Sequence, residues 1–287
     1  MAIGYNVWRV AGLPPVEPLS PAQRLYALID GAQLDDFRRH FRETRGVLGK
    51  VNLAGSTLSA QLENAGQHLL YLEGIEALAH VLERIVRSGS SHGALSVIVS
   101  SLELFALADA LRKRLHVTLP DQFDCVSRFF DGRVTPHWLS VLKPEQREVF
   151  TAFASQWWVV SHEHVWVSLA CTEIDPDPFD QPMSITERQQ ADMIDACYPY
   201  TVIDHFELTD PELLERLPPA EQYAWFARAL AAARRHGIDD GPQSMLFCTL
   251  TLTRGERFYE APAWQQGLTQ VQQGQTRLRD LMKAIDD

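Results

Sequence analysis

The sequence predicts an α/β (α+β) N-terminal domain with a mixed or mainly parallel sheet flanked by helices, followed by an all-α C-terminal lobe. Three observations indicate this fold. The first half alternates short apolar runs, typical of buried strands, with amphipathic segments typical of helices. A segment with three prolines and four acidic residues follows at 173–184. After this segment, apolar residues recur at a spacing typical of helices.

These features divide the chain into four parts. Pro14, Pro15, Pro18 and Pro21 interrupt the first segment, which we expect to form an extended arm. The predicted parts are the arm at 1–23, an α/β domain at 24–172, a linker at 173–184 and a helical lobe at 185–287.

The strands of the first domain are predicted by short apolar runs, several of which end in a turn signal. These runs are RLYALIDG (24–31), HLLYLEG (68–74), ALSVIVSS (94–101), DCVSRFFDG (124–132), QWWVV (156–160) and HVWVSLA (164–170). The Val and Ile content of 94–101 favours a strand.

Helices are expected between these strands. Leu34, Phe37 and Phe41 recur at helical spacing. Residues 75–88 read as a second helix, and Ser101 can cap a third. Residues 134–154 read as two short helices broken near a proline.

The C-terminal lobe carries start and stop signals of helices. A helix is predicted from Thr186, and another with Pro219 near its start and Gly237 just past its end. Residues 239–255 alternate like a strand, but Asp240 favours a helix start, so we predict a helix that stops at Gly255. One or two helices close the chain.

Composition limits the function classes. The net charge of −11 argues against a nucleic-acid binder, because neutralising phosphates needs a basic face. No stretch approaches the roughly 20 apolar residues that cross a bilayer, and the N-terminus lacks a secretory signal, so we expect a cytoplasmic protein without membrane contact. The four cysteines form no C-x-x-C pair and are expected as small buried side chains in a reducing compartment. We expect no cofactor.

The stretch GSSHG (89–93) fits G-x-S-x-G, the turn that presents a catalytic serine in many hydrolases. That turn needs a strand before Ser91 and a helix after it. Here the predicted order is helix, then turn, then strand. Gly89 is better interpreted as a helix C-cap and Gly93 as a turn residue.

Two histidines in HEH are the next candidates. On a strand, His162 and His164 would share a face and could share a metal. A third ligand is not evident, and a turn between two strands explains the same residues. We therefore expect no metal site.

Two aspartates each precede a glycine at a predicted strand end. Asp30 and Asp131 could form an acid/base pair if these ends meet. The alternative is turn chemistry, in which each carboxylate caps a backbone N–H and Arg128 pairs with one of them. We favour the turn interpretation and expect no catalytic residue.

The chain resembles the bacterial type VI secretion adaptor-chaperones, whose shared domain is known as domain of unknown function number 4123. The resemblance covers about residues 24–160. It is carried by LYALIDGA, LLYLEG, the helix that follows Ser101, the Trp pair at 157–158 and, most specifically, RFFDGRVTPHWLSVL with LKPEQREVF after it. The turn residues of this motif are Asp30, Gly31, Arg128, Asp131 and Gly132.

This resemblance implies a non-catalytic role. Such proteins bind a toxic effector in the cytoplasm and help to load it onto the spike protein VgrG. Exposed aromatic residues around Phe258, Tyr259 and Trp264 are our candidates for partner contact. The alternatives are an immunity protein that neutralises a toxin and, less favoured, a hydrolase.

Overall fold

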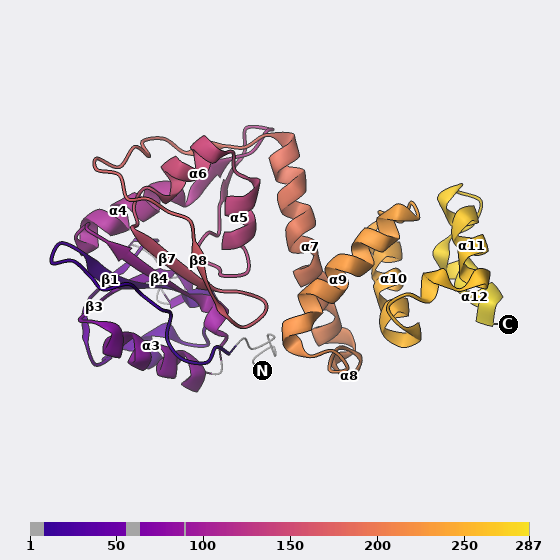
Figure 1. The fold of residues 1–287 in the computed structure, drawn as a ribbon, viewed down its shortest axis with the longest axis horizontal. Helices are drawn as coiled ribbons and strands as arrows, with labels where there is room; N and C mark the ends of the chain where they lie inside the picture. Colours follow the sequence, from indigo (N-terminus) through magenta and orange to yellow (C-terminus); the bar gives the residue numbers. More distant parts are fainter. Residues whose placement is uncertain (1–8, 56–63, 89, 287) are drawn as a thin grey trace. The chain divides into compact units, whose positions relative to one another are not determined.

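The structure is a computed structural model that describes residues 9–55, 64–88 and 90–286, with the side chains of His92 and Asp286 left out (Figure 1). Residues 1–8 of the predicted arm and Gly89 lie outside the described residues. The chain forms two compact units, Met1–Ile194 and Asp195–Asp287. Their boundary falls inside helix α7 (Glu187–Thr209), not at 184.

A six-stranded sheet forms the centre of the first unit. Its strands, in spatial order, are β2 (Val47–Asn52), β3 (Gln67–Leu72), β1 (Arg24–Asp30), β4 (Leu95–Ser100), β7 (Gln156–Val160) and β8 (Trp166–Leu169). Every neighbouring pair is antiparallel. The prediction of a mixed or mainly parallel sheet was therefore wrong.

The physical reason lies in strand β1. Strand β3, helix α3 (Ile75–Arg87) and strand β4 form the expected strand–helix–strand unit. Strand β1 pairs antiparallel with both β3 and β4 and so separates the two strands that run in the same direction. Helices cover both faces of the sheet, so the central strands β1 and β4 are buried along nearly their whole length, as the strands of parallel sheets usually are.

Alternating side chains of β1 serve two cores. Leu25, Ala27 and Ile29 pack with α3 and with α1 (Phe37–Phe41) on one face. Tyr26 and Leu28 face the other core, which is covered by α4 (Leu104–Arg114), α5 (Thr135–Val141) and α6 (Pro144–Thr151). The helices lie on the two sides of the sheet in Figure 1.

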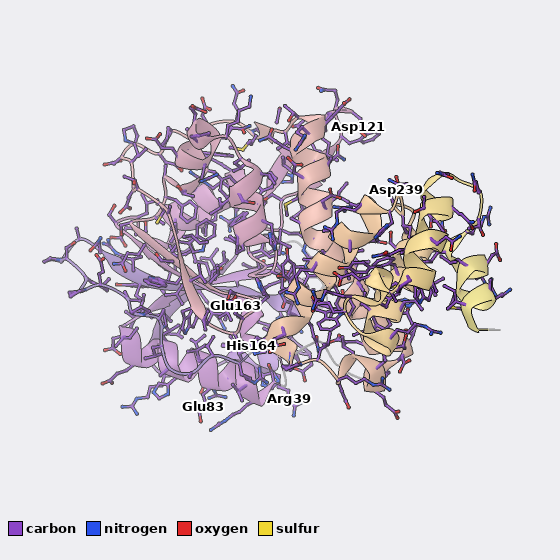
Figure 2. The ribbon with its side chains drawn as sticks, turned by 45° about the vertical axis from the view of Figure 1, so that its right-hand side comes forward. Arg39, Glu83, Asp121, Glu163, His164 and Asp239 are labelled. Carbon is purple, nitrogen blue, oxygen red and sulfur yellow. The ribbon has the colours of Figure 1, made fainter. Side chains whose placement is uncertain are left out.

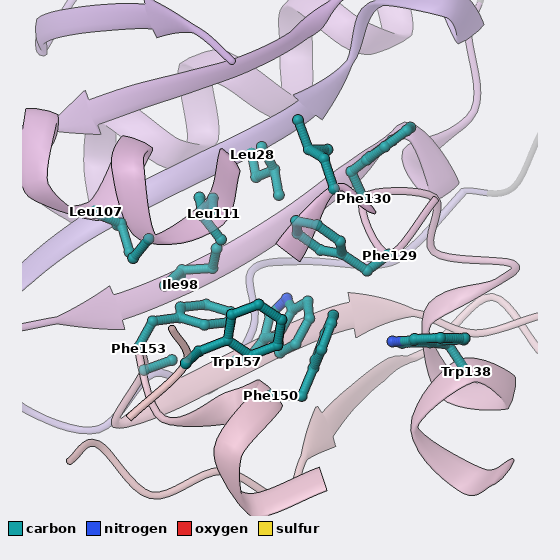
Figure 3. Packing of buried hydrophobic residues seen from close by; sticks show 14 of the residues in the cluster. Leu28, Ile98, Leu107, Leu111, Phe129, Phe130, Trp138, Phe150, Phe153 and Trp157 are labelled. Carbon is teal, nitrogen blue, oxygen red and sulfur yellow. The ribbon is translucent and has the colours of Figure 1, made fainter. Parts of the chain in front are cut away.

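Aromatic rings fill the second of these cores (Figure 3). Trp157 of β7 is fully buried and meets Phe153 edge-on at a centroid distance of 5.2 Å and Phe129 at 6.2 Å. Phe150 of α6 meets Phe129 edge-on at 5.5 Å. Such edge-to-face pairs add to the stabilisation from burial.

The segment predicted as a linker, 173–184, packs on the first unit. Glu173 Oε1 accepts hydrogen bonds from Ser100 Oγ (2.9 Å) and from Ser101 N and Oγ (2.7 and 2.8 Å), so Ser101 binds this segment instead of capping α4. Asp177 pairs with the buried Arg114 at 2.7 Å, and Phe179 is buried. Proline and acidic residues alone do not distinguish an exposed linker from an ordered loop.

This segment ends in a small second sheet of three strands. Strand β5 (His116–Thr118) pairs antiparallel with β6 (Asp124–Val126) and parallel with β9 (Met183–Ser184). The strand predicted at 124–132 therefore ends at Val126, and a turn follows it. That turn carries the candidate site.

The described part of the predicted arm has no helix or strand before β1 and lies against the sheet. Leu13 and Val16 pack on the core that faces α3. Trp166 Nε1 of β8 donates to Gly12 O at 3.2 Å, and Glu17 N donates to Gln156 Oε1 at 2.9 Å.

The second unit is helical, as predicted. After α7 it contains α8 (Pro211–Leu214), α9 (Pro219–Arg235), α10 (Gly241–Arg254), the 3-10 turn η3 (Phe258–Glu260), α11 (Pro262–Gln272) and α12 (Leu278–Asp286). The ambiguous segment is helix α10, which Asp240 caps by accepting from Gln243 N at 2.8 Å. Within the described ranges, no helix is long and apolar enough to cross a membrane.

Candidate functional site

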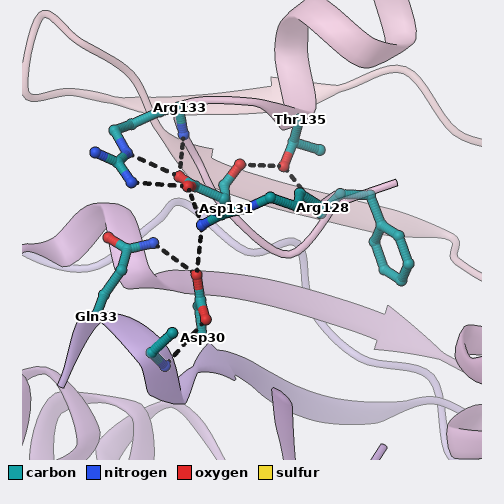
Figure 4. Close-up of polar contacts among 8 residues, drawn as sticks. Asp30, Gln33, Arg128, Asp131, Arg133 and Thr135 are labelled. Atoms are coloured by element: carbon teal, nitrogen blue, oxygen red, sulfur yellow. Dashed lines mark hydrogen bonds and ion pairs between the residues drawn. The ribbon is translucent and has the colours of Figure 1, made fainter. Parts of the chain in front are cut away.

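The predicted turn residues meet at the end of strand β1. Asp30 is the last residue of β1, and Asp131 lies in the turn between β6 and α5. Both aspartates are buried, with 0% and 1% of the residue exposed. Arg128 Nη2 bridges them, at 3.1 Å from Asp131 Oδ2 and 3.5 Å from Asp30 Oδ2 (Figure 4).

Asp30 caps the 3-10 turn η1 (Gly31–Gln33). Its Oδ1 accepts from Ala32 N at 3.1 Å, and its Oδ2 accepts from Gln33 Nε2 at 3.0 Å. Burial raises the pKa of Asp30, an effect that the hydrogen bond from Gln33 opposes and the nearby Asp131 carboxylate reinforces. Asp30 therefore depends on its donors to remain charged.

Asp131 organises the turn before α5. Its Oδ1 accepts from Arg133 N (3.0 Å) and Nε (3.1 Å), and its Oδ2 accepts from Arg133 Nη2 at 2.9 Å (Figure 4). Its carbonyl oxygen accepts from Thr135 Oγ1 at 2.8 Å. This fork of guanidinium on carboxylate is the stronger, bidentate form of an ion pair.

Arg128 differs from the aspartates because its side chain is 50% exposed. Its φ of +43° lies in the left-handed region, which a residue with a side chain adopts at a cost of about 1 kcal/mol. The ion pairs to Asp30 and Asp131 hold it there. The site thus presents one guanidinium at the surface above two buried carboxylates.

Two glycines allow the close approach of these chain segments. A Cβ on Gly132 would lie 2.9 Å from Gly93 O and 3.2 Å from Val160 O. A Cβ on Gly31 would lie 2.2 Å from Asn64 O and 2.4 Å from Gly66 O. Both positions therefore require glycine because backbone atoms occupy the space.

The arrangement satisfies the turn interpretation of the two aspartates. All four carboxylate oxygens accept hydrogen bonds from protein donors. Sequence reasoning missed two donors, Gln33 and Arg133, although their spacing of three and two residues from an aspartate is a local signal that could have identified them.

Ser91 does not lie on a strand-to-helix turn. It follows α3 and precedes η2 (His92–Ala94) and β4, so the order is the inverse of a nucleophile elbow. Ser91 is buried, and its Oγ accepts from Gly93 N at 3.1 Å. The hydroxyl therefore supports the local turn.

His162 and His164 lie in the turn between β7 and β8, and Figure 2 labels His164. His164 has a φ of +60°, so the backbone there is not that of a strand, on which the two side chains would share a face. Burial and the neighbouring His162 lower the pKa of His137 of α5 to about 4. Throughout the described residues, no group of three or more His, Cys, Asp or Glu side chains is placed to hold a metal.

The aromatic partner candidates belong to the core of the second unit. Phe258 and Trp264 are 7% and 5% exposed and meet edge-on at 4.8 Å. Tyr259 packs beside them on Phe247 at 5.7 Å. The expectation of exposure was wrong for Phe258 and Trp264, because the helices of this unit bury large side chains between them, and Tyr259 is half-buried.

The candidate site lies within a stretch of the chain that matches a family model. Residues 25–149 match the model of a family described as a domain of unknown function (DUF4123). This range contains Asp30, Arg128, Asp131 and both glycines, and the match supports membership of the domain in that family. No curated protein and no solved structure matches the chain.

Proposed function

We propose that this protein is a non-catalytic adaptor or chaperone. In this proposal it binds a type VI secretion effector in the bacterial cytoplasm and promotes loading of the effector onto the VgrG spike. The proposal rests on the resemblance of residues 24–160 to such adaptors and on the family match within the same range.

The observation that carries the proposal is the closed polar network of Asp30, Arg128, Asp131 and Arg133. Arg128, Asp131 and Arg133 lie in the most specific block of the resemblance, and Asp30 lies in its LYALIDGA stretch. Each carboxylate oxygen of the network is engaged by a donor of the protein. Such a network supports a rigid scaffold for binding.

The two-unit organisation supports the same role. An adaptor holds a cargo and a target, and two separately packed units offer a separate surface for each. The cores of the two units consist of different residues, so each unit has its own core to support the conformation of its surface.

The test is affinity purification of the tagged full chain from its native bacterium, followed by mass spectrometry. An untagged strain is the control for nonspecific proteins. We expect a toxin-like protein and VgrG to be recovered together. A second purification from a strain without VgrG should still recover the toxin.

Two outcomes would contradict the proposal. Recovery of a toxin alone, with its activity blocked, would indicate an immunity protein, because such a protein need not contact the spike. A chain that recovers no protein but reacts at Ser91 with an active-site probe for serine hydrolases would indicate an enzyme.

A further inference from the structure

A basic groove lies at the edge of the main sheet, next to helix α1 and strand β2. Residues 37–50 contain five arginines and lysines and one acidic residue, in a chain whose net charge is −11. Strand β2 lies at one end of the strand order and, among the described residues, pairs with β3 alone. The surface therefore carries a local charge opposite to that of the whole chain.

The groove consists of two adjoining hollows that share Arg42 and Lys50. One, of about 600 Å³, is lined by both of these and by residues that include Arg45, Leu48 and Arg84. The other, of about 520 Å³, adds Arg38 and Arg39. Together they form the basic groove, which also has apolar side chains in its wall.

Four cations of this groove form no ion pair with a described residue. Arg39, Arg42, Arg45 and Lys50 are exposed, and none of the four forms an ion pair with any residue that the structure describes. Figure 2 shows Arg39 at the surface of the first unit. By contrast, the exposed Arg188 holds Asp192 at 2.9 Å.

Two structural explanations account for only part of this charge. Lys50 and the bulge between Val47 and Gly49 are devices that protect an edge strand from aggregation. Arg39 lies in the last turn of α1, where cations suit the helix dipole. Arg42 is the C-cap of α1 and also suits the dipole, but neither explanation accounts for Arg45, which lies between the helix and the strand.

We infer that this groove binds an acidic, extended polypeptide segment of a partner protein. Carboxylates of the segment would pair with Arg39, Arg42 and Arg45, and an apolar side chain would contact Leu48, which is 57% exposed. A nucleic acid fits less well, because Phe41 is only 3% exposed and offers no ring for base stacking. The inference rests on the proposed function only for the identity of the partner, which would be the effector or the spike.

The experiment measures fluorescence anisotropy of a fluorescein-labelled peptide of alternating glutamate and leucine, titrated with the purified full chain. The test variant is the triple substitution Arg39→Gln, Arg42→Gln and Arg45→Gln. The matched control removes the same charge from exposed positions of the second unit by Arg216→Gln, Arg279→Gln and Lys283→Gln. All six side chains are exposed, and circular dichroism checks that both variants are folded.

We expect the native chain to bind the peptide with an affinity that falls as salt rises from about 50 to about 300 mM. The groove variant should bind about tenfold more weakly, since three exposed ion pairs are lost, while the control should stay within about twofold. Equal weakening in both variants would overturn the inference, because only net charge would then matter. So would the absence of binding to the native chain, or preferential binding of a labelled single-stranded oligonucleotide.

This result can be separated from that of the affinity purification. Peptide binding that fails while effector and VgrG are recovered rejects the groove and leaves the adaptor role. Peptide binding that succeeds while VgrG is not recovered supports the groove and rejects the adaptor role.

Discussion

Asp177→Ala should destabilise the first unit, because it leaves a buried arginine without its counter-charge. The side chain of Arg114 is 0% exposed, and its guanidinium donates to both carboxylate oxygens of Asp177 at 2.7 Å. It also donates to the carbonyls of Phe150 (2.7 Å), Ala110 (2.8 Å) and Val149 (3.1 Å). The substitution removes the only carboxylate from this set.

The magnitude follows from these contacts. Breaking a buried ion pair by removing one partner costs about 3–5 kcal/mol. Two aromatic rings still stabilise the cation, since the guanidinium carbon lies 4.5 Å from the centre of Phe179 and 5.0 Å from that of Phe153. We therefore expect the low end of the range, about 3 kcal/mol. With a urea dependence of about 3 kcal/mol per M for a unit of this size, the midpoint should fall by about 1 M.

Pulse-labelling hydrogen exchange across a urea series measures this midpoint for peptides of strands β1 and β4, and so for the first unit alone. Asp180→Ala is the matched control, because it makes the same change at an exposed position of the same segment. A midpoint that moves no more in Asp177→Ala than in Asp180→Ala would refute the reasoning. It would indicate that 173–184 is a linker that does not stabilise the first unit.

The pH dependence offers an independent check of the same pair. Burial would raise the pKa of Asp177, but the hydrogen bonds from Arg114 outweigh it and lower the pKa below its usual value. A carboxyl with a lowered pKa in the folded state stabilises the fold above its unfolded pKa of about 3.9 and loses that contribution as pH falls further. The stability difference between the native chain and Asp177→Ala should therefore shrink below about pH 4.

Three further results are expected. Gly132→Ala should cost about 1–3 kcal/mol in urea unfolding, because its Cβ would meet the carbonyl of Gly93 at 2.9 Å, whereas Gly74→Ala, with open space around the Cβ, should stay within about 0.5 kcal/mol. The pKa of His137 is about 4, below its unfolded value of about 6.5, so stability should fall as pH drops through this window. Between pH 7.5 and 5 the native chain should lose about 2 kcal/mol more than His137→Gln, and equal losses would contradict the pKa. Trp264→Ala should lower the stability of the second unit by about 3–5 kcal/mol in urea unfolding, as expected for a core residue. An unchanged urea midpoint would contradict the burial of Trp264.

Local sequence signals located most elements of the fold. The apolar runs at 24–31, 68–74 and 94–101 correspond to β1, β3 and β4, and the asymmetric proline and glycine signals correspond to α9. They did so because hydrophobic period and cap residues act over a few neighbouring positions. The pairing of strands depends on segments far apart in the chain, so the direction of the sheet was mispredicted.

The candidate site shows the same division. The Asp-Gly pairs predicted turns at Asp30 and Asp131, and both turns exist. Their juxtaposition through Arg128 joins residues 98 positions apart, which turn chemistry alone does not specify. The exposure of Phe258 and Trp264 was mispredicted because composition shows that these side chains are apolar but not whether they face the core or the solvent.

The sequence by itself determined where most helices and the strands β1, β3, β4 and β7 lie, that turns follow Asp30 and Asp131, and that the second unit is helical. These properties depend on backbone conformation and on the periodicity of neighbouring side chains. Only the tertiary structure decided the antiparallel sheet, the anchoring of Asp177 on Arg114, the polar network below Arg128 and the basic groove beside β2. Each of these brings distant segments together, and its free energy depends on burial and charge pairing that exist only once the chain is folded.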